Sequence, residues 1–239
     1  MNISRKFKSL FNLIIDYYRF IRICFMNKQE KFSYIYKSKY WRGAEGGSLS
    51  GGGSNEQSTS ILINELISFI KTNNIKSILD IPCGDWKWMS TVNLGNINYI
   101  GCDIVPDLIE ANNNKYKNKS VNFFVKSLID DELPDSDFII IRDLLVHLDD
   151  EDIIKCLKNI KKYNYKFIGI TNYPGLEVNK RRILGDYFRL GDKWRPMNLS
   201  KEPYNLPNPT YNLSDINNLS TIDKKKYISV WKSENFNVL

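Results

Sequence analysis

The sequence predicts an α/β domain built on a mostly parallel sheet. Short apolar runs that read as buried strands recur along the chain and alternate with segments of helical character. The first run, Ser77–Leu79, ends at Asp80 and leads into a tight turn, and a second run, Tyr99–Cys102, ends at Asp103. Strands that end in polar turns are typical of the ligand-binding edge of an open α/β sheet.

The other elements follow from periodicity and capping signals. A helix is expected from Ser58 or Ser60 as its cap, with its end at Thr72–Asn74. Its expected buried face is Ile61, Leu62, Leu66, Ile67, Phe69 and Ile70. Further expected elements are a helix over Pro106–Lys117, strands over Val121–Val125, Asp137–Ile141 and Lys166–Thr171, a helix that begins at Asp149–Asp152, and a closing hairpin that includes Tyr204, Leu206, Tyr211 and Lys226–Trp231.

The turn after the first strand restricts the ligand. Gly84 permits close approach of the backbone to a ligand, whereas Pro82 lacks an N–H group, so the turn is poor in the donors that a pyrophosphate needs. Asp80 and Asp85 repel a pyrophosphate but suit the ammonium and sulfonium of S-adenosylmethionine. Asp103 follows one strand-turn-helix unit later, where an acid that binds a ribose is expected. These charges favour S-adenosylmethionine over NAD.

The same turn carries a resemblance to a known family. Asp80–Met89, DIPCGDWKWM, resembles the DxPCGDxxWM motif of a bacterial group of class I S-adenosylmethionine-dependent methyltransferases. The resemblance continues in Tyr99–Pro106, Ile141–Leu148 and Trp194–Leu199, and it covers roughly Tyr40 to Trp231. It implies a Rossmann-like fold with a mostly parallel seven-stranded sheet and a closing antiparallel hairpin. The group is often associated with capsule or surface-polysaccharide gene clusters, which suggests a carbohydrate or small anionic metabolite as acceptor.

The resemblance also assigns residues to the cofactor. The glycine-rich segment Tyr40–Ser54 reads either as a flexible linker or as a strip that folds over the cofactor, with Arg42 facing its carboxylate. Many methyltransferases place an acid beyond the third strand to bind adenine, but Ser127 stands there, which leaves Ser127, the Leu128 backbone and Asp130 as candidates for this contact. The expected cofactor-binding residues are Trp41, Arg42, Asp80, Cys83, Gly84, Asp85, Asp103, Ile104, Ser127, Leu128 and Arg142.

Candidate catalytic residues follow the fourth strand. His147 is the only histidine in the chain, and it reads either as a general base or as a histidine that ends an apolar turn. Asp143 is expected to position the acceptor or the cofactor amine. Trp194 and Arg195, on the long connection Tyr173–Asn198, are the expected acceptor-binding residues, because an aromatic face suits a ring and an arginine fork suits an oxyanion.

Composition divides the chain into two parts: a basic helical extension over residues 1–39 and a methyltransferase domain over residues 40–239. Met1–Arg42 holds ten Lys and Arg residues against Asp16 and Glu30, a net charge of +8, whereas the whole chain is +7. The basic character therefore belongs to the leader, and nucleic acid is not an expected partner of the body. The leader places Phe7, Leu10, Phe11, Ile14, Tyr17, Tyr18, Ile21 and Phe25 at helical spacing.

Two interpretations of this leader remain: a helix packed on the core or a partner, or an interfacial helix in peripheral contact with the inner face of an anionic membrane. The four cysteines form no CxxC pair, so neither a metal site nor a disulfide scaffold is indicated, and a reducing cytoplasm fits. Two further functions stay open. One is an RNA or protein methyltransferase with the leader as a docking arm, and the other is a non-catalytic cofactor-binding assembly partner.

Overall fold

A seven-stranded sheet forms the centre of the computed structural model, which describes residues 21, 25–41, 47–180, 194–216 and 225–238. The strand order is β3-β2-β1-β4-β5-β7-β6, with β7 antiparallel to both of its neighbours and the other pairs parallel. This confirms the predicted mostly parallel sheet with a closing antiparallel hairpin. The strands are β1 (Ser77–Asp80), β2 (Asn98–Asp103), β3 (Val121–Val125), β4 (Phe138–Ile141), β5 (Phe167–Asn172), β6 (Tyr211–Ser214) and β7 (Tyr227–Lys232).

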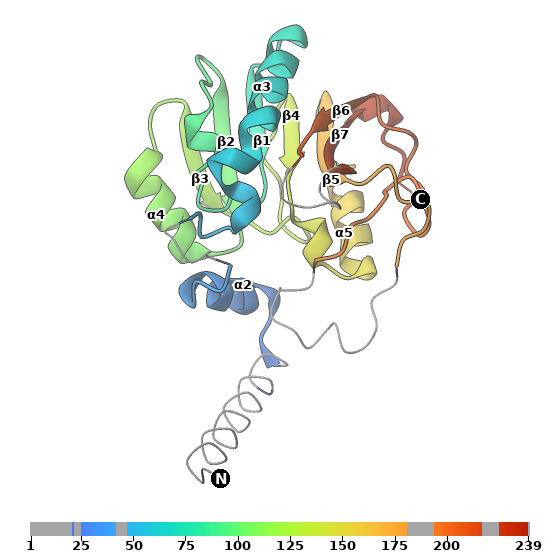
Figure 1. Ribbon diagram of the computed structural model, residues 1–239. Helices are drawn as coiled ribbons and strands as arrows, with labels where there is room; N and C mark the ends of the chain where they lie inside the picture. Colours follow the sequence, from blue (N-terminus) through green and yellow to red (C-terminus); the bar gives the residue numbers. More distant parts are fainter. Residues whose placement is uncertain (1–20, 22–24, 42–46, 181–193, 217–224, 239) are drawn as a thin grey trace.

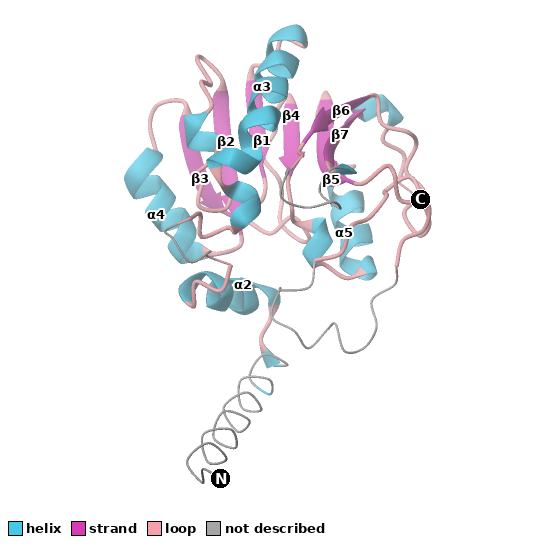
Figure 2. Cartoon of the chain, viewed as in Figure 1, coloured by secondary structure: helices cyan, strands magenta, loops and turns pink. Residues whose placement is uncertain are grey.

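Helices cover both faces of the sheet (Figures 1 and 2). The described α-helices are α2 (Lys28–Lys37), α3 (Glu56–Thr72), α4 (Pro106–Tyr116) and α5 (Asp150–Ile160). Apolar residues of α3 and α4 share one hydrophobic cluster with the sheet, and those of α5 share the other. This two-sided cover explains why β4 and β5 are buried along their whole length, with β4 apolar throughout and β5 apolar from Phe167 to Ile170.

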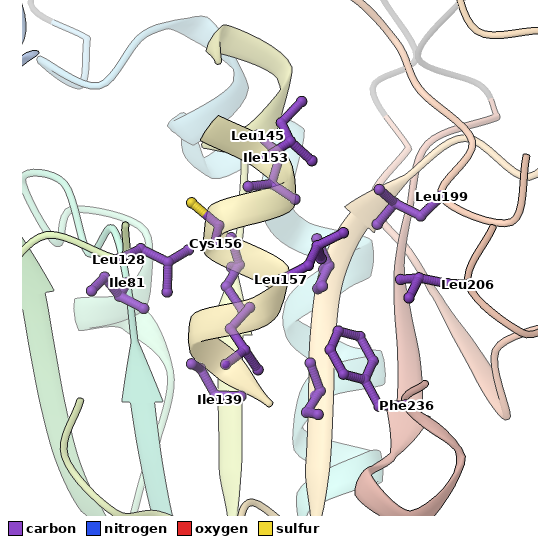
Figure 3. Close-up of a cluster of buried hydrophobic side chains, with 14 of the residues drawn as sticks. Ile81, Leu128, Ile139, Leu145, Ile153, Cys156, Leu157, Leu199, Leu206 and Phe236 are labelled. Carbon is purple, nitrogen blue, oxygen red and sulfur yellow. The ribbon is translucent and has the colours of Figure 1, made fainter. Parts of the chain in front are cut away.

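The cluster under α5 is densely packed (Figure 3). Ile153, Cys156 and Leu157 of α5 pack against Ile139 of β4, and each of these four side chains is at most 1% exposed. The Asp149 carboxylate caps the helix by accepting a hydrogen bond from the Asp152 amide. The predicted acidic start of this helix is thereby confirmed.

The start of α3 differs from the prediction. The helix begins at Glu56 after Asn55, so neither Ser58 nor Ser60 is its cap. The Ser58 hydroxyl instead donates to the Gly52 carbonyl, because the preceding strip folds back onto the first helical turn. The predicted buried face holds for Leu62, Leu66, Phe69 and Ile70, whereas Ile61 is 39% exposed.

Helix α2, within the basic leader, packs on the body of the protein. Asn27 and Glu30 form a reciprocal capping box, and Ile35 is buried. The Lys28 ammonium pairs with Asp152 of α5 at 2.5 Å. Figure 1 shows α2 beside the carboxyl ends of the strands, at the edge of the sheet where the ligand is expected.

Most of the predicted amphipathic run of the leader lies outside the described residues; within them, Phe25 is 86% exposed. In the part of the chain that the structure describes, no helix is both long and apolar enough to cross a membrane.

Candidate functional site

The parallel register gathers the predicted polar residues at one edge of the sheet. Asp80 ends β1, Asp103 ends β2, and Arg142 and Asp143 directly follow β4, which pairs with β1. At these strand ends lies a cavity, here called the inner cavity. Its lining comprises Phe32, Tyr36, Trp41, Ser50, Ser54, Asp80, Pro82, Cys83, Gly84, Trp88, Asp103, Ile104, Arg142, Asp143, Leu144 and His147.

Asp80 presents a buried carboxylate oxygen to this cavity. Its side chain is 1% exposed, and Oδ2 accepts a 2.5 Å hydrogen bond from the Tyr99 hydroxyl. Among the described residues, Oδ1 has no hydrogen-bond partner. Burial raises the pKa of Asp80 to about 7. A buried oxygen of this kind requires a donor, and an ammonium group satisfies both its charge and its lone pairs.

Asp103 connects the second strand to the turn. Its Oδ2 accepts from the Gly84 amide at 3.2 Å, and its Oδ1 accepts from the Val105 amide at 3.1 Å. Burial raises its pKa to about 6. Each carboxylate oxygen keeps a second lone pair, so Asp103 is able to accept from a ribose diol while it holds the turn in shape.

Gly84 permits the close packing of this turn. Its φ is +56°, and a Cβ at this position would lie 2.4 Å from Ser50 Oγ. The Tyr36 hydroxyl lies 3.0 Å from the same Ser50 oxygen. The neighbouring Cys83 thiol is buried, and burial raises its pKa, which fits the predicted small residue beside a ligand rather than a nucleophile.

The glycine-rich segment is built into the site. The Asp85 carboxylate accepts from the Ser48 hydroxyl at 2.8 Å and from the Leu49 amide at 2.7 Å, and Gly52–Ser54 forms a 3₁₀ turn. The interpretation as a flexible linker is therefore wrong for residues 47–54. Asp85, expected to touch the cofactor, does not line the inner cavity and instead fastens the strip to the turn.

A cluster of four charges includes Arg142 and Asp143, which line the inner cavity. Arg142 makes a bidentate contact with Asp215 through Nε at 2.9 Å and Nη2 at 2.8 Å. The Lys226 ammonium lies 2.6 Å from Asp143 Oδ2 and 2.9 Å from Asp215 Oδ2. Arg142 Nη2 also donates to the Gly53 carbonyl at 2.8 Å, which ties the strip to the cluster.

The cluster determines the charge of its members. Burial alone would raise the pKa of Asp143, but the Lys226 ammonium and the Arg142 guanidinium hold it well below its usual range. The pKa of Arg142 is raised, because Asp215 and Asp143 outweigh the effect of its burial. Asp215 and Lys226 were missed in the sequence, since they lie 73 and 83 positions from their partners and carry no local motif.

The predicted catalytic pair lies at the junction of two cavities. Asp143 adopts a left-handed φ of +56°, and its amide donates to the Thr171 hydroxyl at 2.8 Å. His147 lies beside Trp41, with 5.0 Å between the ring centroids. Both Asp143 and His147 line the inner cavity and the adjoining one.

The adjoining space, here called the outer cavity, has a volume of about 390 Å³. Trp194, predicted to bind the acceptor, lines it and stacks on Tyr173 at an interplanar angle of 17°. Its lining comprises Tyr40, Trp41, Ser50, Gly51, Gly52, Gly53, Ser58, Arg142, Asp143, Val146, His147, Tyr173, Trp194, Asp215 and Lys226.

Arg195 lines neither cavity. Its guanidinium donates to the Asp150 carboxylate, to the Tyr204 hydroxyl at 3.0 Å and to the Lys180 carbonyl at 2.8 Å. These contacts join the connection after β5 to α5 and to the segment before β6. The structure therefore corrects the expectation that Arg195 grips the acceptor. Arg42 and residues 181–193 lie outside the described residues.

A third cavity continues from the inner one along the end of β3. Ser127 and Leu128, both predicted to contact adenine, line it together with Asp103 and Ile104. Asp130 does not line it. The Ser127 amide is occupied by Asp131 at 2.7 Å, and Leu128 and Leu144 supply apolar walls. In the described part of the chain, no three His, Cys, Asp or Glu side chains gather as a metal site would require.

Comparison with known proteins supports a methyltransferase. Residues 78–163 match the family model of a methyltransferase domain, and they include Asp80, Gly84, Asp103, Asp143 and His147. The match covers the first to fourth strands and the turns that carry the inner cavity. It confirms the predicted class of enzyme at the level of this domain. No protein of curated function matches the sequence.

Solved structures share the fold at low sequence identity. The structure titled "PigF with SAH" has a TM-score of 0.56 and 12% identity, and the match covers 87% of this chain and 63% of PigF. Magnesium protoporphyrin IX methyltransferase from Synechocystis PCC 6803, with bound SAH, has a TM-score of 0.52 and 11% identity over 84% of this chain and 96% of its own. This chain covers only about half to two thirds of the length of several other matched structures. The likeness confirms the predicted fold of the class I methyltransferases.

Proposed function

We propose that this protein uses S-adenosylmethionine to methylate an oxygen atom of a carbohydrate or a small anionic metabolite destined for a cell-surface glycan. One observation supports the proposal above all. The inner cavity brings together the Gly84 turn, Asp103 and the Asp80 oxygen that has no partner among the described residues, and it joins a second cavity at Asp143 and His147.

The residues fit S-adenosylmethionine along its length. Asp80 would hold the ammonium end, and Asp103 would accept from the ribose hydroxyls. Ile104 and Leu128, which line the third cavity, would hold the adenine. The cofactor supplies an electrophilic methyl group on a sulfonium, and this chain supplies its position and surroundings.

The protein's own contribution is alignment and exclusion of water. Phe32 and Tyr36 of α2 close one side of the inner cavity, and the strip held by Asp85 closes another. Holding two reactants in line can lower a barrier by roughly 7–11 kcal/mol. If the acceptor is an alcohol, His147 is placed to take its proton, whereas a phosphate or carboxylate oxygen needs no base.

The proposed acceptor class has two supports. The sequence motifs resemble those of the methyltransferase group named above, and Trp194 lines the outer cavity, where its face could pack on the ring of a sugar. The net charge of +8 over Met1–Arg42 favours a second candidate, an RNA methyltransferase with the leader as a docking arm. The remaining candidates are a methyltransferase with a protein acceptor and a non-catalytic assembly partner. The assay described next distinguishes both from the proposed function.

Single-turnover assays separate these functions. The full chain is mixed with methyl-labelled S-adenosylmethionine and either a cell-envelope extract, total RNA or a protein extract. We expect label in the glycan or metabolite fraction of the envelope extract. Label confined to RNA or protein would overturn the proposed acceptor. Tight cofactor binding with no labelled product in any extract would favour the assembly role.

A further inference from the structure

The four charges at the outer cavity differ in their access to it. The Asp143 side chain is 31% exposed, whereas those of Lys226, Arg142 and Asp215 are 8%, 5% and 1% exposed. The carboxylate of Asp143 is therefore the most exposed of the four charged groups that line the outer cavity.

Both cations are already neutralised by carboxylates. Lys226 contacts Asp143 and Asp215, and Arg142 is held by the bidentate contact with Asp215. Among the described residues that line the outer cavity, the two positive and two negative charges balance. An anionic acceptor would have to displace one of these pairs or approach the exposed carboxylate, and both are unfavourable.

An ionised carboxylate accepts hydrogen bonds and donates none, so it selects a donor such as a hydroxyl group. The Lys226 ammonium and the Arg142 guanidinium keep the pKa of Asp143 below its usual range, so the carboxylate stays ionised at neutral pH. The same low pKa makes Asp143 a poor proton acceptor, which leaves that role to His147.

Aromatic rings line the same cavity as this carboxylate. Trp194 is 40% exposed and is supported from behind by Tyr173 at a centroid distance of 6.1 Å. Trp41 lies beside His147 and also lines the cavity. The negative face of an aromatic ring attracts the C–H face of a sugar, while the hydroxyls of that sugar point outward to polar groups.

We infer that the acceptor is a neutral sugar ring that packs on Trp194 and donates a hydroxyl hydrogen bond to Asp143. This inference rests on the proposed function and decides between its two acceptor classes. The acceptor oxygen forms its bond to the methyl carbon while the carbon–sulfur bond breaks, and the electron pair of that bond stays on sulfur. The proton of this acceptor hydroxyl passes to His147, and the hydrogen bond to Asp143 comes from a neighbouring hydroxyl of the same ring.

The test uses the full chain and two pools of acceptors. A partial acid hydrolysate of bacterial envelope polysaccharide is separated by anion exchange into neutral and anionic oligosaccharides. Each pool is incubated with the protein and methyl-labelled S-adenosylmethionine, and S-adenosylhomocysteine binding is measured in parallel by calorimetry. We expect at least tenfold more label in the neutral pool.

Two variants test the hydrogen bond to Asp143 and the packing on Trp194 separately. Asp143→Asn leaves Lys226 and Arg142 facing a single carboxylate, so the ratio of neutral to anionic labelling should fall at least tenfold. Trp194→Ala should raise the KM for the neutral pool at least fivefold, with calorimetric affinity for S-adenosylhomocysteine within threefold of the parent. Glu151→Gln, on the exposed side of α5, is the matched control and should change neither value.

Each result has one meaning. More label in the anionic pool, or no label in either pool despite S-adenosylhomocysteine binding, would overturn the neutral-sugar acceptor while leaving the cofactor assignment in place. Unchanged pool preference in Asp143→Asn would overturn the role of the exposed carboxylate. Failure of the parent protein to bind S-adenosylhomocysteine would instead overturn the proposed function.

Discussion

The Tyr99 hydroxyl donates a 2.5 Å hydrogen bond to Asp80 Oδ2, from the strand next to the one that ends in Asp80. This bond fixes the carboxylate and leaves its other oxygen, buried and unpartnered among the described residues, for a ligand. Burial of the pair raises the pKa of Asp80 to about 7, close to physiological pH. The protonation of Asp80 therefore controls how well the site binds a cation.

We expect cofactor affinity to fall as the pH is lowered from 8 to 6, because protonated Asp80 no longer attracts the ammonium group. Calorimetric titration with S-adenosylhomocysteine across this range measures the effect. Asp80→Asn should weaken binding by about 1.5–3 kcal/mol at pH 8 and flatten the profile. A parent profile that is already flat would contradict the assignment of Asp80.

The same pKa predicts a trend in stability. In the unfolded chain Asp80 ionises near 3.8, whereas in the folded, ligand-free protein it stays protonated up to about 7. Its contribution to the free energy of unfolding therefore declines as the pH rises through this window. Asp80→Asn should show less of this decline in chemical denaturation, and an identical decline in both proteins would assign it to other groups.

Two glycines with nearly the same backbone conformation test the packing of the strip. Gly84 and Gly95 have φ values of +56° and +55°, but only at Gly84 would a Cβ clash, 2.4 Å from Ser50 Oγ. Both alanine variants carry the backbone strain. Gly84→Ala should also displace the strip and weaken S-adenosylhomocysteine binding at least tenfold, with Gly95→Ala unchanged. Equal affinity in the two variants would mean that the strip does not support the site.

The position of α2 beside the inner cavity predicts how many N-terminal residues can be removed before cofactor binding is lost. Removing residues 1–26 keeps the Asn27 cap and the cavity-lining Phe32 and Tyr36, so cofactor binding should persist. Removing residues 1–39 should weaken it at least tenfold, because one wall of the inner cavity is lost. Thermal stabilisation by S-adenosylhomocysteine reports on both proteins. Equal stabilisation would show that α2 is dispensable for the site, and failure of the shorter deletion to fold would place earlier residues in the core.

Arg195 is expected to stabilise the fold. Arg195→Ala removes the contacts to Asp150 and Tyr204, and it should lower the free energy of unfolding by about 1–2 kcal/mol in urea denaturation. The KM for the acceptor should stay within threefold. Arg195→Lys should recover part of the stability, since a lysine cannot reproduce the fork. A tenfold rise in KM with unchanged stability would return Arg195 to the acceptor site.

The sequence predicted the elements whose patterns are local. Apolar runs indicated β1 to β5, and the central strand β4 shows no alternation because it is buried along its whole length. The acids at the ends of β1 and β2 were recognisable because the turn chemistry and the spacing of Asp80 and Asp103 are local features. The true start of α3 was missed, since Asn55 makes no side-chain cap and Ser58 bonds to the strip instead.

Features that depend on distant partners could not be predicted in this way. The ion cluster joins Arg142 after β4 with Lys226, which directly precedes β7, and its carboxylate Asp215 follows β6. The role of Arg195 depends on Asp150, 45 positions away, so its sequence neighbours Trp194 and Pro196 suggested the wrong contact. Only the three-dimensional register of the sheet brings these groups together.

A calorimetric titration of the full chain at pH 8 with S-adenosylhomocysteine and, separately, with NAD tests the assignment of the inner cavity to S-adenosylmethionine. We expect one binding site per chain for S-adenosylhomocysteine, weakened at least tenfold by Asp80→Asn, and no measurable binding of NAD. Binding of NAD in preference to S-adenosylhomocysteine, or affinity for S-adenosylhomocysteine that Asp80→Asn leaves unchanged, would contradict this assignment.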